Sequence, residues 1–454
     1  MINYTLPLVI LHNVTRSRRQ YFGYVSASAF AVATFFSFGF FLLHPTLQAK
    51  LSSDVSSALA QLLLVGQIGV AIFAVFFVLF FHRFLLRLRA HEFGLWTILG
   101  ISPRQLQRMV RIESVFLATI AITIGLLLSF VETAVLFHIL NRPLDIPALD
   151  LRFEPAAIYY GLAFFTALFG VDAYTSAHSL RKLTPKILLN TTKTGQGSVR
   201  ISRWRLVVGV GAIIVSYALA LGFQGASAGV SSANILPIVI LISIGTYFVI
   251  NQGLVFVLTH MRKKALSGLA LISVSRLTHR VRDFAKVLTV VSLLQAGVLT
   301  LIGVALGIFS HLHQMATSDN ELRMFIQLFS IVMFVFLFLA FLFFGAALST
   351  LWAKLFTQVD EDRHQFRGLQ RIGLSHNETR SIIKRELAVL FLVPTIIAVL
   401  HATVAMGEFT TKIAPKDLSN QDTWIYFGYL SLCYVGLSLI NLTIACWRYT
   451  KSLA

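Results

Sequence analysis

The sequence predicts an all-α, polytopic membrane protein in which ten helices cross the bilayer. Hydrophobic residues make up 56% of the 454 residues and charged residues only 13%, more apolar surface than a soluble domain can bury. Ten runs free of Lys and Arg are long enough to cross a bilayer. Two stretches of the chain also repeat each other at a fixed offset. Together these observations predict two parallel four-helix repeats separated by two further helices.

A spanning helix needs about 20 predominantly apolar residues. The runs that meet this requirement cover residues 21–43, 58–81, 114–138, 156–177, 206–225, 234–259, 287–309, 324–352, 387–407 and 424–446. The predicted organisation is a first repeat over 1–178, a basic linker with spans five and six over 179–259, and a second repeat over 260–454. Each repeat is expected to begin with a short interfacial helix and to contain four spans.

The basic residues predict the orientation of the chain. Of the 38 Lys and Arg residues, 32 fall in alternate segments between the spans, at 1–20, 82–113, 178–205, 260–286, 353–386 and 447–454. Because basic residues concentrate on the cytoplasmic side, we expect a protein of the cytoplasmic membrane with both termini in the cytoplasm. The net charge of +19 is then a topology signal, and nucleic acid is not an expected partner.

Two cytoplasmic stretches align without gaps at an offset of 273 residues. The first starts at His91 and the second at His364. The identical pairs are His91/His364, Phe93/Phe366, Gly100/Gly373, Ser102/Ser375 and Glu113/Glu386. An even number of spans separates the two copies, so they have the same orientation in the membrane.

Each copy predicts a short helix, a sharp turn and a second helix that enters the membrane. Apolar residues recur at helical spacing, as Phe93, Trp96 and Leu99 in one copy and as Phe366, Leu369 and Ile372 in the other. A glycine then suits a helix C-terminus with positive φ, and a serine with Gln or Glu three residues later forms a capping box. We call residues 91–102 and 364–375 the first and second knobs. They are expected to receive a two-fold cytoplasmic partner, although ordinary interfacial connectors are an alternative.

The first knob resembles the coupling-helix region of FtsX-like permeases, whose pattern is matched by Glu92, Gly100, Ser102 and Glu113. The whole layout is similar to Bce-type permeases, which confer resistance to peptide antibiotics in bacteria. The resemblance implies the membrane subunit of an ABC transporter, two copies of a cytoplasmic ATPase as partners, and an amphipathic substrate such as a peptide antibiotic or a membrane lipid. It also implies a histidine kinase as a further partner. Two features depart from the family: Gln365 replaces the acidic residue in the second knob, and residues 310–323 leave no room for a large extracellular domain.

The residues expected to couple to the ATPase share the two repeated segments. They are His91, Glu92, Phe93, Trp96, Gly100, Ser102, Glu113, His364, Gln365, Phe366, Leu369, Gly373, Ser375 and Glu386.

No catalytic or metal site is expected in this chain. It has no GxxxxGK[ST] phosphate-binding loop, so ATP and Mg are expected in the partner ATPase. Glu132 is a candidate for meeting a cationic substrate because acids within spans are functional candidates, with helix packing as the alternative. A second possible function is that of a mechanical or signalling protein that uses the same ATPase to regulate a partner without transport. An ion-coupled secondary transporter is disfavoured.

Overall fold

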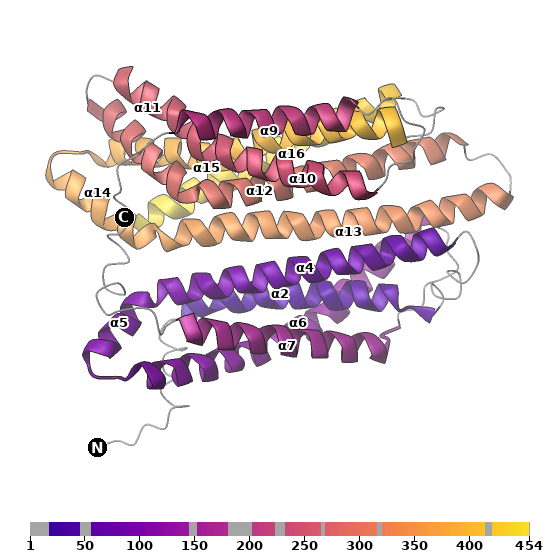
Figure 1. Cartoon of the computed structure of the whole chain (residues 1–454), viewed down its shortest axis with the longest axis horizontal. Helices are drawn as coiled ribbons and strands as arrows, with labels where there is room; N and C mark the ends of the chain where they lie inside the picture. The colour runs from indigo at the N-terminus through magenta and orange to yellow at the C-terminus, as the bar shows by residue number, and fades with distance from the viewer. Residues whose placement is uncertain are drawn as a thin grey trace. The chain divides into compact units, whose positions relative to one another are not determined.

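The computed structural model describes residues 18–45, 56–144, 152–179, 202–222, 232–264, 268–315, 320–413 and 420–453. Over these residues the chain is helical and contains no strands (Figure 1). Ten helices within the described part are long and apolar enough to cross a membrane. The prediction of an all-α, polytopic protein with ten spans is therefore confirmed. Residues 1–17, where the first interfacial helix is expected, lie outside the described residues.

The chain divides into two compact units, and the first comprises residues 1–196 with 323–335. Its described helices are α2 (Arg18–Leu42), α4 (Ser56–Leu88), α5 (Ala90–Ile98), α6 (Pro103–Leu144) and α7 (Pro155–Ser179). Helix α2 packs against α4, α6 and α7 and buries several phenylalanines, among them Phe36 and Phe38. Gly125 allows α6 to approach α2 closely, because a Cβ atom there would lie 2.5 Å from Val32 Cβ.

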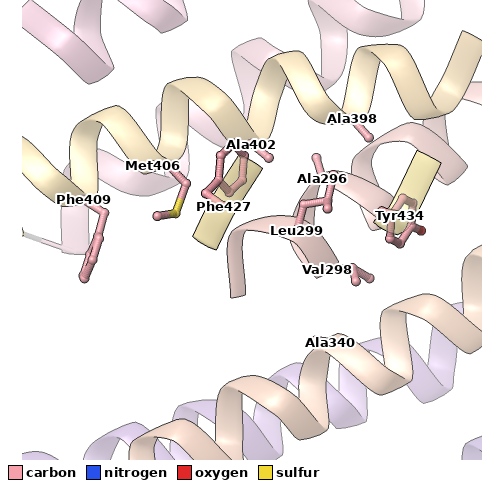
Figure 2. Packing of buried hydrophobic residues seen from close by; sticks show 10 residues of the cluster. All are labelled: Ala296, Val298, Leu299, Ala340, Ala398, Ala402, Met406, Phe409, Phe427 and Tyr434. Carbon is pink, nitrogen blue, oxygen red and sulfur yellow. The ribbon is translucent and has the colours of Figure 1, made fainter. Parts of the chain in front are cut away.

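The second unit comprises residues 197–322 with 336–454. Its helices are α9 (Arg203–Gly222), α10 (Ser232–Phe248), the π-helix η2 (Val249–Leu254), α11 (Val255–Lys264), α12 (Gly268–Met315), α14 (Val359–Arg371), α15 (His376–Glu408), the π-helix η3 (Phe409–Ile413) and α16 (Asn420–Leu453). Helix α13 (Asn320–Thr357) is shared, because its residues 323–335 belong to the first unit and those from 336 onward to the second. Helix α12 packs against α15 and α16. Figure 2 shows part of the buried apolar cluster of this unit, with Ala402 and Met406 of α15 close to Phe427 of α16.

Helices α9 and α10, the fifth and sixth spans, belong to the second unit. His401 of α15 connects them to it. Tyr217 Oη of α9 lies 2.6 Å from His401 Nδ1, and Thr246 Oγ1 of α10 lies 2.9 Å from His401 Nε2. The two spans between the repeats are thus held to the second unit by a buried polar contact as well as by apolar packing.

The basic segment expected as an interfacial helix before span seven is largely continuous with that span. Helix α12 runs unbroken from Gly268 to Met315, because no proline and no glycine interrupts residues 269–296. Only four residues separate α12 from α13, so no domain is inserted between spans seven and eight.

Candidate functional site

The first knob folds as the sequence predicts. Helix α5 ends at Ile98, and Gly100 has a φ of 93°, a value that favours glycine. The backbone N–H of Ile101 donates to Trp96 O at 3.1 Å, which closes the turn. The side chain of Ser102 then accepts the N–H of Gln105 at 3.3 Å, and the Ser102 N–H donates to Gln105 Oε1 at 2.9 Å. This capping box starts α6.

The second knob repeats the same geometry. Helix α14 ends at Arg371, and Gly373 has a φ of 108°. The N–H of Leu374 donates to Leu369 O at 3.1 Å. Ser375 accepts the N–H of Glu378 at 3.2 Å, and its own N–H donates to Glu378 Oε2 at 2.9 Å. The duplicated turn and cap chemistry is confirmed in both copies.

Phe93 and Phe366 lie inside the protein. Their side chains are 0% and 2% exposed, and Phe93 packs against Ala90, Leu106 and Val110. Phe93 therefore fixes the first knob to α6, and Phe366 packs beneath Arg276 of α12. That Phe93 and Phe366 couple to the ATPase stays a prediction: helical spacing identifies an apolar face, and in the structure both rings of that face are buried.

A buried arginine ties the first knob to the membrane helices. Arg89, directly before α5, is 2% exposed and forms ion pairs with Glu92 of α5 and Glu113 of α6. Tyr21 of α2 also donates a hydrogen bond to Glu113. The Arg89 guanidinium carbon lies 5.0 Å from the centre of the Phe93 ring. Burial alone lowers the pKa of Arg89, but the hydrogen bond and charge of Glu113 raise it above its ordinary value, so Arg89 keeps its charge.

Two arginines of α12 do the same for the second knob. Arg276 Nη2 and Nε lie 2.9 Å from Asp362 Oδ1 and from Glu386 Oε1, respectively. Arg280 Nη1 lies 2.8 Å from Asp362 Oδ2 and 2.6 Å from Glu386 Oε2. The Arg276 guanidinium carbon lies 4.1 Å from the centre of the Phe366 ring, and Tyr449 of α16 donates to Asp362. We call these two groups of residues the first and second clamps.

Sequence reasoning missed the basic partners in both clamps. The signal was available, because extending the 273-residue alignment two positions before His91 pairs Arg89 with Asp362. The charge at this position is reversed between the copies, so the second clamp needs arginines from another helix. Arg276 and Arg280 are four residues apart and share one face of α12. In the sequence their basic character indicates only topology.

The remaining expected coupling residues lie on or beside the knobs. Glu92, Trp96 and Leu369 are half-buried, whereas Ser102, His364, Gln365 and Ser375 are exposed. Gln365 accepts a hydrogen bond from Arg276 Nη1 at 2.6 Å, so it replaces the acidic Glu92 as a neutral partner of the clamp. The side chain of His91 lies outside the described residues.

Glu132 is separate from both clamps. It lies half-buried on α6, and its Oε1 atom has no hydrogen-bond partner among the described residues. Within the described part of the chain, no group of three or more His, Cys, Asp or Glu residues could hold a metal ion.

One family of known membrane proteins matches part of the chain. The family model described as FtsX-like permease C-terminal matches residues 65–185. Residues 65–185 form an FtsX-like permease domain. This domain contains the first knob and helices α5 to α7, with most of α4.

The chain is also similar to several ABC transporter permeases. It is 28% identical to the ABC transporter permease protein YxdM of Bacillus subtilis over 295 residues, which are 64% of this chain and 46% of that protein. It is 26% identical to the bacitracin export permease protein BceB of Halalkalibacterium halodurans over 323 residues, 67% of this chain and 47% of that protein. The BceB protein of Bacillus subtilis is 22% identical over 311 residues, 65% and 47% of the two chains. The matched regions therefore span about half the length of these relatives.

Proposed function

We propose that this chain is the permease subunit of an ABC transporter and that its two knobs receive the motion of a pair of cytoplasmic ATPase subunits. One observation carries the proposal: both copies of the repeat join an exposed turn to a membrane helix through a buried clamp. ATP and Mg would bind to the ATPase subunits, and this chain would perform no covalent chemistry. The similarity to named ABC transporter permeases supports the assignment.

The clamps would transmit movement of each knob to a membrane helix. Glu113 lies ten residues after Pro103, the first residue of α6, which is about 15 Å along the helix at 1.5 Å per residue. Because Arg89 joins this position to α5, the short helix and the first turns of α6 move as one body. Arg276 and Arg280 join α14 to α15 through Glu386 in the same way. Movement of an ATPase subunit would thus tilt α6 or α15 directly.

The proposed substrate is amphipathic, such as a peptide antibiotic or a membrane lipid. Two relatives are named as bacitracin export permeases, and Glu132 offers a half-buried carboxylate within a span for a cationic group. The alternative is a protein that uses the same ATPase to regulate a partner, such as a histidine kinase, without transport. A substrate-stimulated ATPase rate that is lost in Glu132→Gln would favour transport.

One permease chain is expected to bind two ATPase subunits. The two knobs lie in one chain, so the permease needs no second copy of itself to match a two-fold ATPase. Co-expression with a candidate ABC ATPase, followed by light scattering of the purified complex, measures the ratio. Two permease chains for each ATPase pair would contradict the role given to the internal repeat.

Residues 190–200 and both termini are expected in the cytoplasm of a bacterial cell. The test uses a variant with Cys433 and Cys446 replaced by serine, into which Ser198→Cys or Ser318→Cys is introduced. An impermeant thiol reagent added to intact cells should label the second site and spare the first. Ready labelling at position 198 would overturn the orientation.

A further inference from the structure

We propose that the two knobs hold their ATPase subunits by different chemistry: the first by an apolar ridge and the second by charge around a basic hollow. The inference rests on the proposed function and adds the chemistry of the partner surface. A groove with an apolar floor and an acidic rim on each ATPase subunit would fit both knobs.

The outer surface of the first knob is apolar. Leu95, Ile98 and Leu99 are 49%, 60% and 73% exposed. Ile98 and Leu99 sit at the end of α5, directly before the turn at Gly100. These three side chains lie three and four residues apart at one end of the helix, where they share a face and can serve as an interaction surface. We call them the apolar ridge.

The second knob keeps one of these three apolar residues. At an offset of 273, Leu95 corresponds to Gly368, Ile98 to Arg371 and Leu99 to Ile372. Gly368 and Arg371 are exposed, and Ile372 is 81% exposed. The apolar side chain nearest the turn is thus common to both knobs, whereas the other two positions become small or basic.

Gly368 lines a hollow beside the second knob. An open pocket of about 550 Å³ lies between α11, α12 and α14, and its lining includes Arg262, Arg276, Ser275, Gln365 and Gly368. A Cβ atom at Gly368 would meet nothing within 4 Å.

The charge of this pocket is not fully neutralised. Arg276 is already paired with Asp362 and Glu386. Arg262 is exposed at the end of α11 and forms no ion pair with a described residue. Arg262 therefore offers an uncommitted positive charge at the hollow, and Arg371 adds an exposed one at the end of α14. An acidic side chain complements both.

The partner chemistry follows from the symmetry of the ATPase. Two identical subunits present the same surface to both knobs, so this surface must accept Leu99 at one knob and Ile372 at the other. An apolar floor satisfies this common requirement, and the rest of the apolar ridge extends over it. An acidic residue at the rim would meet Arg371 and Arg262 at the second knob only.

The two contacts should then respond differently to salt. Screening shortens the range of charge interactions from about 10 Å at 0.1 M salt to about 3 Å at 1 M, whereas apolar contacts persist. We expect the affinity of the second knob to fall by about tenfold or more over this range and that of the first knob to change little.

The test measures the stoichiometry of the nucleotide-free complex by light scattering at 0.1 M and 1 M NaCl. Without nucleotide, the ATPase subunits are held mainly by the permease. The expected result is two ATPase subunits for each wild-type permease at low salt and one at high salt. Arg262→Glu with Arg371→Glu should retain one subunit at both salt concentrations. Gly368→Leu with Arg371→Ile, which gives the second knob the residues of the first, should retain two at both.

Loss of both ATPase subunits from the wild-type permease at high salt would overturn the inference. Two bound subunits in all three proteins at both salt concentrations would also overturn it. Failure of wild-type permease to bind any ATPase at low salt would instead contradict the proposed function. The same proteins in nanodiscs with and without phosphatidylglycerol test a lipid headgroup as the occupant of the hollow. Arg262→Glu could instead change the ATPase rate only in nanodiscs with phosphatidylglycerol and leave the stoichiometry unchanged. That result would assign the hollow to a lipid headgroup and contradict the proposal.

Discussion

Replacing Arg89 by methionine is expected to lower the free energy of unfolding by about 3–5 kcal/mol, because the change leaves Glu113 buried without its countercharge. Glu113 is 3% exposed, and the same substitution removes the cation that lies over the Phe93 ring. Unfolding in detergent, followed by circular dichroism during a denaturant titration, measures the loss. ATPase stimulation should fall in parallel, because the clamp that transmits motion from α5 to α6 is broken.

A double variant separates the charge from the packing. Arg89→Met with Glu113→Gln removes both ions, so most of the stability should return even though the clamp is gone. ATPase stimulation should stay low in this variant. Arg262→Met is a matched control, since Arg262 is exposed and unpaired among the described residues, and its stability should change by less than about 0.5 kcal/mol. Wild-type stability in Arg89→Met would show that the clamp is not a structural element.

Replacing Phe93 or Phe366 by alanine is expected to cost about 3–5 kcal/mol of stability, because each change removes a fully buried ring and leaves a cavity. Both rings lie beneath an arginine of their clamp. Each substitution should therefore make its knob more mobile as well as lower the stability of the protein. The measurement is the same denaturant titration, combined with limited proteolysis at the turns that contain Gly100 and Gly373.

Exposed neighbours in the same knobs provide the control. Leu99→Ala and Ile372→Ala remove side chains that are 73% and 81% exposed, so stability should change by less than about 0.5 kcal/mol. Binding of the ATPase should nevertheless weaken, because these residues face outward. If the phenylalanine variants kept full stability and lost only ATPase binding, the rings would be contact residues and the assignment of roles would be reversed.

The membrane fold could be predicted from the sequence because it depends on local signals. The runs of apolar residues identify the ten spans, and Gly100 with Ser102 specifies a turn and a cap that need only neighbouring residues. Gly373 and Ser375 do the same in the second copy. These features are confirmed because backbone geometry and capping act over a few residues.

The interior of the site could not be predicted in the same way. The spacing of Phe93 and Trp96 shows that one face of the helix is apolar, but which element covers that face depends on tertiary packing. The clamp partners are distant in the sequence, since Arg280 and Glu386 are 106 residues apart. A count of basic residues by segment treats Arg280 like any cytoplasmic arginine, although it is 6% exposed and paired with two carboxylates.

Site-specific photo-crosslinking from positions 99 and 372 tests the central claim most directly. Leu99 and Ile372 are the most exposed apolar residues of their knobs, and a photoreactive amino acid at either position should attach to the ATPase subunit in intact cells. Position 93, which is buried, should crosslink only within the permease. We expect ATPase adducts from both exposed positions and none from position 93. Adducts to lipid alone at both positions would show that the knobs are interfacial connectors and would contradict the proposed coupling.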